Sequence, residues 1–533
     1  MAMKELGQAV AEAAKKLYGQ EIEPELTRPD EQFGDYSTNV AMQLAKEVGK
    51  NPREIAEALV GAIKSPLITK AEVAGPGFIN FWLSDEALLA QMDAKPATPL
   101  ATQEILVEFG DPNPFKEMHI GHLYSYVAGE SLCRLLEGQG ATVRRLSYHG
   151  DVGLHVAKAI WGMQQGSATS IGEYYQKGAQ AYEEDPAAKA AIDEINEHIY
   201  AHDNPEIEKL YQQGKDQSFK EFDKILELLN IKTDKRYLES DSTESGIGTV
   251  KANIGKVFEQ SEGAVVYKGE QDGLHTRVFL TSRGLPTYET KDLGLAELKA
   301  KDYPQAARSI IVTAHEQAEY FKVMLAALAK IQPELAAKTT HLYHGFVNLS
   351  SGKMSSRKGQ VFTAGRLLND VAQEVKKSFE KPSPEVEQGA IKYGFLKHRL
   401  GSDIAYDPAE SVSLEGNSGP YLQYAYARAN SIVGKAKSEG AKSKSNKLEP
   451  GERSLARKIG EYSEVAEQAA AEMLPSHICT YLYELAQAFN RFYESNRVID
   501  DKRQAIRLEL VRAYTKCLKS GLELLNIPAP ERM

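Results

Sequence analysis

The sequence is poor in cysteine and has no long hydrophobic run. Its three cysteines, Cys133, Cys479 and Cys517, are an odd number without paired spacing, which argues against a disulfide framework and a structural zinc site, and we expect no protein-bound metal. No apolar run approaches the ~20 residues that a membrane-spanning helix needs, so we expect no membrane partner. The stretch MAMKELGQAVAEAAKKLYG alternates apolar and charged residues at helical spacing, which predicts an amphipathic helix, no secretion signal, and hence a cytoplasmic protein with reduced thiols.

The chain also lacks an excess of positive charge. Its formal net charge of −10 excludes a protein that coats nucleic acid indiscriminately, although local basic surfaces could still hold one RNA. Charge alone does not decide the partner, and we expect no DNA partner. At 533 residues the chain is too long for a single core, so its length predicts roughly three or four domains.

One stretch, ILVEFGDPNPFKEMHIGHLYSY, carries the strongest local signal. Residues 105–109 read as a buried strand, residues 110–114 as a turn, and His119-Ile120-Gly121-His122 as the first turn of a helix. Two imidazoles at i and i+3, beside backbone N–H groups without an intrahelical partner, suit a phosphate, and Gly121 would let a flat base lie on the backbone. Taken alone, this four-residue pattern fits two surface histidines equally well.

A second segment, GKMSSRKG, begins at Gly352 and combines three cations with two hydroxyls, as a loop closing over a polyphosphate would require. Alone it could be a solvated basic turn. Together the two segments resemble the HIGH and KMSKS elements of class I aminoacyl-tRNA synthetases, and the surrounding sequence resembles arginyl-tRNA synthetases over nearly the whole chain. Ser356 stands where KMSKS has its second lysine, so Lys353 and the displaced Arg357 and Lys358 supply the charge.

The alternation of strand and helix patterns predicts a multidomain α/β protein with a doubly wound, Rossmann-like parallel sheet, in which ligands bind beyond the carboxyl ends of the strands. We expect VVYKG and TRVFLTSRG to continue this sheet. The predicted parts are an N-terminal α+β domain at 1–97, a catalytic domain at 98–375 with a helical insertion at about 158–235, and an α-helical bundle at 376–533. The resemblance implies that the first binds the tRNA elbow and the last the anticodon.

Tyr288 and Asp292 are spaced i and i+4 on a predicted helix. A surface pair beside Lys291 is the simpler interpretation. The resemblance implies instead that they hold the substrate guanidinium, which suits a carboxylate that accepts two N–H bonds and an aromatic ring that flanks it. It also implies arginine-binding roles for Glu108, Asn113, Glu244 and Gln317. Glu108 could equally be a strand-end acid paired with a basic neighbour.

The resemblance implies that the protein is an arginine–tRNA ligase, which activates L-arginine with ATP to arginyl-adenylate and transfers it to the 3′ terminal adenosine of tRNA(Arg). ATP would bind to His119, Gly121, His122, Lys353, Ser355 and Lys358, with Mg²⁺ on its phosphates. Catalytic roles fall to His119, His122, Lys353 and Lys116, a lysine found in many members that lack the full second motif. tRNA contacts fall to Phe33, Asp35, Asn39, Tyr421, Tyr424 and Met533. We expect a monomer.

Two other functions are possible. A small-molecule nucleotidyltransferase shares the H-x-G-H turn but has no reason to carry a C-terminal helical bundle with a GNSGPYLQYA block. A catalytically impaired tRNA-binding relative would lose the phosphate-binding residues, whereas His119, His122 and Lys353 are all present.

Overall fold

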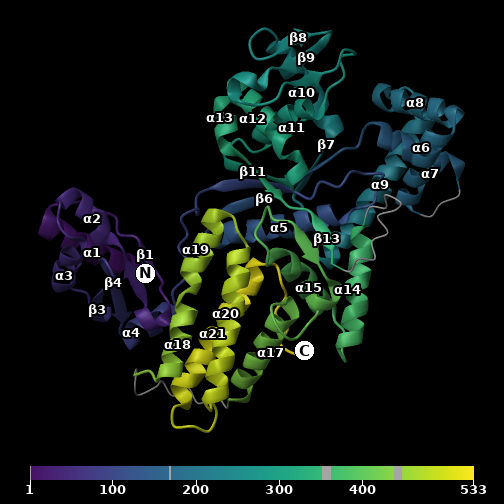
Figure 1. Ribbon diagram of the computed structural model, residues 1–533. Helices are drawn as coiled ribbons and strands as arrows, with labels where there is room; N and C mark the ends of the chain where they lie inside the picture. Colours follow the sequence, from purple (N-terminus) through teal and green to yellow (C-terminus); the bar gives the residue numbers. More distant parts are fainter. Residues whose placement is uncertain (1, 167–169, 351–361, 437–446) are drawn as a thin grey trace.

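The chain folds into an N-terminal α/β part, a central parallel sheet surrounded by helices, and a C-terminal helical bundle (Figure 1). The computed structural model describes residues 2–166, 170–350, 362–436 and 447–533. The predicted fold class is confirmed.

The N-terminal part is a four-stranded antiparallel sheet, in the order β1-β2-β4-β3, with helices packed against it. Along β4 the side chains of Ile79, Phe81 and Leu83 alternate into the core, as expected for a half-buried strand. Its elements are α1 (Ala2–Tyr18), β1 (Leu26–Thr27), η1 (Glu31–Phe33), β2 (Tyr36–Thr38), α2 (Val40–Val48), α3 (Pro52–Ala62), β3 (Ile68–Ala74), β4 (Phe78–Leu83) and α4 (Asp85–Met92).

The central sheet has five strands in the order β12-β11-β5-β6-β7, and every neighbouring pair is parallel. The middle strand, β5, is buried from Ile105 to Phe109, as is typical of a parallel sheet covered on both faces. The strands are β5 (Glu104–Phe109), β6 (Thr142–His149), β7 (Lys235–Leu238), β11 (Ala306–Ala314) and β12 (Thr339–His344).

Helix α5 (Ile120–Gly138) follows β5 and is buried on nearly all sides. Its close approach to the strand depends on Gly129, because a Cβ there would lie 2.1 Å from Cγ of Phe109. This packing holds the amino end of α5, and with it the two histidines, against the carboxyl edge of the sheet.

VVYKG and TRVFLTSRG do not continue the central sheet, so this prediction was wrong. They form β9 (Ala264–Tyr267) and β10 (Arg277–Leu280), which pair antiparallel with β8 (Glu259–Ser261) in a separate three-stranded sheet. Phe258, Tyr267 and Phe279 give this sheet its own core beside α10 (Glu239–Ala252), α11 (Tyr288–Asp302) and α12 (Ala318–Ile331). Short connections favour antiparallel pairing, whereas another parallel strand would need a longer crossover.

A helical insertion lies between β6 and β7 and appears at the right of the view in Figure 1. It has a separate apolar core that includes Phe115, Ile160 and Ile192. Its helices are α6 (Leu154–Gln165), α7 (Ile171–Glu184), α8 (Pro186–Ala201) and α9 (Pro205–Leu228).

The C-terminal part is a helical bundle in which Phe489 and Tyr514 stack with ring centroids 4.0 Å apart. Short strands β13 (Val347–Leu349) and β14 (Ile404–Tyr406) connect it to the centre. The remaining elements are η2 (Gly269–Asp272), η3 (His315–Gln317), α13 (Pro333–Lys338), α14 (Ala364–Ser378), α15 (Pro384–Leu396), α16 (Pro408–Ser411), α17 (Gly419–Lys435), α18 (Pro450–Gly460), α19 (Tyr462–Glu472), α20 (Ser476–Ser495) and α21 (Gln504–Leu524).

Candidate active site

Polar residues gather where the parallel strands end. Because the carboxyl ends of parallel strands meet at one edge, residues from distant parts of the sequence are brought together there. Segments that follow β5, β6, β7 and β11 supply Asn113, Lys116, His119, His155, Glu239 and the exposed Gln317. This edge of the sheet is the candidate active site.

The two histidines hold each other in one arrangement. His119 is the N-cap of α5, and its Nδ1 accepts the backbone N–H of Gly121 at 3.1 Å and of His122 at 3.3 Å. Nδ1 of His122 accepts the backbone N–H of His119 at 3.3 Å, and the two rings stack with centroids 3.5 Å apart. A neutral imidazole that accepts at Nδ1 carries its proton on Nε2, so both rings present an Nε2–H donor.

Both rings are neutral at physiological pH. Burial, followed by the nearby His344 and Lys116, lowers the pKa of His119 to about 4. Burial and the neighbouring histidines lower the pKa of His122 well below its ordinary value. The pair can therefore donate hydrogen bonds to an anion without changing its own charge.

The prediction of free backbone donors in the first turn was wrong. The N–H of Ile120 bonds the carbonyl of Phe362 at 3.0 Å, and those of Gly121 and His122 are capped by the His119 ring. Gly121 permits this cap, because a Cβ there would lie 3.0 Å from the imidazole. A phosphate would meet imidazole donors and the positive end of the helix dipole instead.

Lys116 lies close to the histidine turn, since its charge lowers the pKa of both histidines and of His155. Its Nζ lies 5.1 Å from the centroid of the Tyr175 ring. Burial lowers the pKa of Lys116 itself, so the cation is partly desolvated and its electrostatic effect is strengthened. Lys353, Ser355 and Lys358 lie outside the described residues.

Asp292 is a buried residue of α11, not a surface residue, with only 6% of its area exposed. The hydroxyl of Tyr320 donates a hydrogen bond to its carboxyl group. Burial raises the pKa of Asp292 to about 8. The negative charge of Glu108 also raises this pKa, whereas the hydrogen bond from Tyr320 lowers it. Within the described ranges, no lysine or arginine forms an ion pair with Asp292. Tyr288, four residues earlier, is 68% exposed.

The two acids of α10 nearest to the site differ in burial. Glu244 is exposed on α10, whereas Glu239, the first residue of that helix, is buried beside the site. A Cβ on Gly150 would lie 3.1 Å from Oε1 of Glu239 and 2.8 Å from Oδ1 of Asn113, so these groups share one small space. The sequence signal for Glu239 is its place directly after β7.

Glu108 forms a buried ion pair with Lys299 of α11. This is the paired strand-end acid that the sequence left open as an alternative. Asn113 accepts the backbone N–H of Gly150 at 2.9 Å, which joins the segments after β5 and β6.

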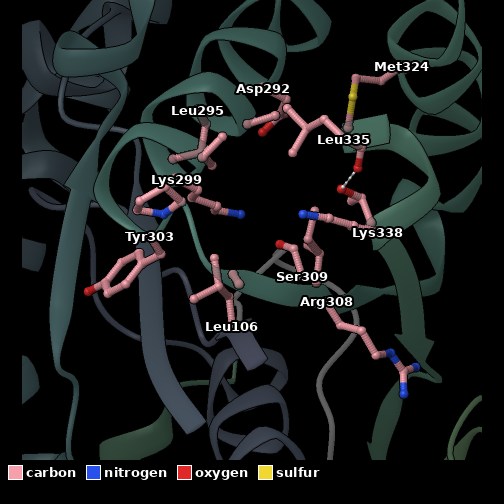
Figure 2. Close-up of a pocket in the computed structure, with 16 residues that line it drawn as sticks. Leu106, Asp292, Leu295, Lys299, Tyr303, Arg308, Ser309, Met324, Leu335 and Lys338 are labelled. Carbon is pink, nitrogen blue, oxygen red and sulfur yellow. Dashed lines mark hydrogen bonds between the residues drawn. The ribbon is translucent and has the colours of Figure 1, made fainter. Parts of the chain in front are cut away.

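A cavity of about 60 Å³ lies beneath α11, and the amines of Lys299 and Lys338 point into it from opposite sides (Figure 2). Asp292 also lines it (Figure 2). Leu106 and Ser309 line it from the middle of β5 and β11, below their carboxyl ends. Ligands of such sheets bind beyond those ends, and the histidine turn lies there, whereas this cavity lies below them.

The three residues of the N-terminal part that were predicted to contact tRNA differ in their exposure to solvent. Phe33 is 50% exposed, and Asn39 is half-buried at the start of α2, with its side-chain oxygen accepting from Gln43 at 2.9 Å. Asp35 is 2% exposed and lies 2.6 Å from Nη2 of Arg453 in α18, so its prediction as an RNA-facing residue was wrong. Its carboxylate instead joins this part to the bundle.

The predicted contacts of the bundle lie around α17, and the C-terminus is beside this helix (Figure 1). Tyr424 and Met533 are 44% and 40% exposed, while Tyr421 is half-buried and its hydroxyl accepts from Asn490 at 3.0 Å. The side chain of Gln423 donates to the carbonyl of Pro528 at 2.9 Å, which attaches the last segment to α17.

The described parts of the chain contain neither a cluster suited to a metal ion nor a membrane-spanning helix. No group of three or more His, Cys, Asp or Glu side chains could hold a metal ion there. No helix among these residues is long and apolar enough to cross a membrane.

The parallel sheet with a histidine turn at its carboxyl edge defines the catalytic domain of a class I aminoacyl-tRNA synthetase. The family model described as "tRNA synthetases class I (R), catalytic domain" matches residues 85–390. The "Arginyl tRNA synthetase N terminal domain" model matches residues 4–83, and the "DALR anticodon binding domain" model matches residues 422–533. The chain belongs to the arginyl-tRNA synthetase family.

Relatives of known function match over nearly the full length. The arginine–tRNA ligase of Synechococcus sp. is 31% identical, covering 94% of this chain and 94% of that protein. That of Limosilactobacillus reuteri is 30% identical, covering 99% of each. The structure of Thermus thermophilus arginyl-tRNA synthetase is similar with a TM-score of 0.85, 27% identity and full coverage of both chains. Arginyl-tRNA synthetase from Plasmodium falciparum, at 22% identity and a TM-score of 0.79, covers 100% of this chain and 99% of that one and shares the fold.

The chain is therefore a class I arginine–tRNA ligase, whose substrates are ATP, L-arginine and tRNA. The predicted family and enzyme class are confirmed. The predicted domain boundaries at residues 97 and 375, and the roles of individual site residues, stay predictions.

Proposed function

We propose that this enzyme binds the guanidinium group of L-arginine between Asp292, Glu239 and the ring of Tyr288. The main support is the buried carboxyl group of Asp292, whose hydrogen bond among the described residues comes from a hydroxyl. A buried carboxylate without a cation is unfavourable, so a planar cationic ligand that donates two N–H bonds would satisfy it. Asn113 and Gln317 then face the amino and carboxylate groups of the substrate.

ATP lies across His119, Gly121 and His122 in this proposal. The arginine carboxylate oxygen attacks the α-phosphorus, a new oxygen–phosphorus bond forms, and the bond to the leaving pyrophosphate breaks. The neutral Nε2–H donors of the two histidines and the ammonium of Lys116 stabilise charge that develops on the phosphate oxygens. Magnesium enters with ATP, on the phosphates of the leaving group.

Three residues of the second motif, Lys353, Ser355 and Lys358, complete the proposed ATP site. In the second step the terminal 2′-hydroxyl of the tRNA attacks the carbonyl carbon of arginyl-adenylate, and AMP leaves. Glu108 contributes indirectly, because it repels the Asp292 carboxylate and so helps to raise its pKa.

For the tRNA, we propose that exposed Phe33 and neighbouring Asn39 contact the elbow, while Tyr421, Tyr424 and Met533 contact the anticodon loop. Exposed aromatic and thioether groups suit unstacked bases. We further propose a monomer that works in the cytosol, consistent with three buried free cysteines.

The proposed arginine site can be tested with Asp292→Asn, which keeps the size of the side chain and removes its charge. We expect the affinity for arginine to fall by several kcal/mol, because the desolvated guanidinium loses one of the two carboxylates that face it. The dissociation constant for ATP should not change. Pyrophosphate exchange against arginine concentration, in the presence of tRNA, measures the effect, and an unchanged arginine dependence would refute the assignment.

A further inference from the structure

A lysine of the enzyme occupies the space between two of the groups proposed to bind the substrate. Nζ of Lys291 lies 2.5 Å from Oε2 of Glu239 and 5.5 Å from the centroid of the Tyr288 ring. The side chains of the ion pair are 8% and 9% exposed. Although burial opposes the charge, the Glu239 carboxylate raises the pKa of Lys291, and Tyr200 from the helical insertion contributes in the same direction.

The surroundings of this ammonium match what an arginine side chain needs. An apolar stem leads to a cation that is held by a carboxylate and faces an aromatic ring. Lys291 and Tyr288 lie on the same turn of α11, and Asp292 is the next residue. Arginine cannot use Glu239 and Tyr288 fully while Lys291 holds both.

We propose that Lys291 is an internal substitute for the substrate cation, which arginine must displace in order to bind. This inference rests on the proposed arginine site. Displacement favours a guanidinium, because its fork of donors can bond two carboxylates at once, Glu239 and Asp292, whereas an ammonium is a point charge. Free lysine offers Glu239 only the group that Lys291 already supplies at the high effective concentration of a tethered ligand. Lys291 thus lowers the affinity for every cation and rejects lysine in particular.

Two substitutions give opposite predictions. Lys291→Met removes the competitor, so the affinity for arginine should rise about tenfold if the site is free of Lys291 about a tenth of the time in the parent enzyme. Lys291→Arg keeps the charge and tethers a stronger competitor, so the affinity for arginine should fall. A structural role predicts the reverse order, with Lys291→Arg near normal and Lys291→Met impaired.

The measurements are arginine titrations by calorimetry on the full chain, with lysine as a competing ligand. Lysine should compete with arginine in Lys291→Met and not in the parent enzyme. If Lys291→Met is too unstable to titrate, Lys291→Arg alone decides, because an affinity equal to or above that of the parent overturns the proposal.

A matched control is Lys330→Met. Lys330 also pairs with a carboxylate, Asp272 at 2.7 Å, and lies 4.9 Å from the centroid of a tyrosine ring, Tyr267, but on α12 away from the strand ends. Its arginine affinity should equal that of the parent. Unchanged affinity in both Lys291 variants, while Asp292→Asn loses arginine, would overturn this inference and leave the proposed site intact; retained binding in Asp292→Asn would overturn the site itself.

Discussion

At the scale of single residues, burial sets the protonation states of His119, His122 and Asp292 more than ion pairs do. The imidazoles of His119 and His122 stay neutral, and the carboxyl group of Asp292 holds its proton to an unusually high pH. Lys116 lies close enough to the histidine turn for its charge to lower the pKa of both imidazoles. Electrostatic interactions between these buried groups and the charged substrates are therefore only weakly screened by water.

The first prediction concerns Lys116. Because neutral imidazoles carry no charge to offset the developing negative charge of the phosphates, Lys116→Ala should lower the rate of arginine activation by ~10²-fold or more, the scale of one preorganised transition-state contact. Lys189→Ala is a matched control, since Nζ of Lys189 also lies over a tyrosine ring, 5.1 Å from the centroid of Tyr182. Pyrophosphate exchange measures both, and a near-normal rate for Lys116→Ala would assign the role to Arg357 or Lys358.

The second prediction concerns pH. The pKa of Asp292 is raised to about 8, so its neutral form dominates below that pH, whereas guanidinium binding needs the carboxylate. The affinity for arginine should therefore rise about tenfold for each pH unit up to 8 and level off above it. Arginine titrations between pH 6.5 and 8.5 at constant ionic strength would measure this rise. Asp292→Asn should bind weakly without this dependence, and a flat profile for the parent enzyme would contradict the assignment.

At the scale of elements, the N-terminal sheet is attached to helices α18 and α19 by charged groups. Arg28 pairs with Glu464 at 2.6 Å, and Asp35 pairs with Arg453 and accepts the backbone N–H of Leu83 at 2.7 Å. The two ion pairs join segments that lie 436 and 418 residues apart in the sequence. The position of any RNA-binding residue on the N-terminal part depends on them.

The third prediction uses two residues of one loop. Asp35→Asn removes a buried partner of Arg453, so it should destabilise the attachment by roughly 3 kcal/mol, within the range for breaking a buried pair. Phe33→Ala, two residues away, should leave stability nearly unchanged because its side chain is half exposed. Hydrogen exchange of β2 and β4 measures the local stability. Normal protection together with weaker tRNA binding in Asp35→Asn would show that Asp35 contacts RNA after all.

Local elements of this fold could be predicted from the sequence, whereas long-range strand pairing could not. The strand at Glu104–Phe109 and the helix after His119 were predicted correctly, because apolar runs, turn residues and helix starts are local signals. The partners of β9 and β10 are set by a separate core that no local signal reveals. The burial of acids on one helix is likewise set by tertiary neighbours: Glu244 is exposed, and on a helix it points about 140° away from the buried Glu239.

The capping of the histidine turn was unpredictable for a similar reason. Whether the first N–H groups of α5 are free depends on Phe362, which is distant in sequence, and on the rotamer of His119. Asp35 likewise reads as a surface acid until Arg453 is placed beside it. Residue type indicates which interactions a polar group can make. Its tertiary neighbours decide whether the group is already paired or is still free to bind a ligand.

At the scale of the whole molecule, catalysis and tRNA recognition occur in different parts of the chain. The histidine turn lies at the central sheet, whereas Tyr424 and Met533 lie in the bundle, where the C-terminus is beside α17 (Figure 1). Changes in the bundle should therefore affect tRNA binding and leave the chemical step unchanged.

The last prediction tests this separation at Met533. Ile527 is buried and the Pro528 carbonyl is bonded to Gln423, so the final segment is held against α17 while Met533 remains 40% exposed. Met533→Ala should raise the KM for arginine tRNA. The corresponding loss of binding free energy should be about 1–3 kcal/mol, the scale of one base contact. The kcat should hardly change, because a remote contact made equally in the ground and transition states lowers KM alone. Steady-state aminoacylation measures both constants; an unchanged KM would refute the contact, and a large loss of folding stability would show that Met533 supports the bundle core instead.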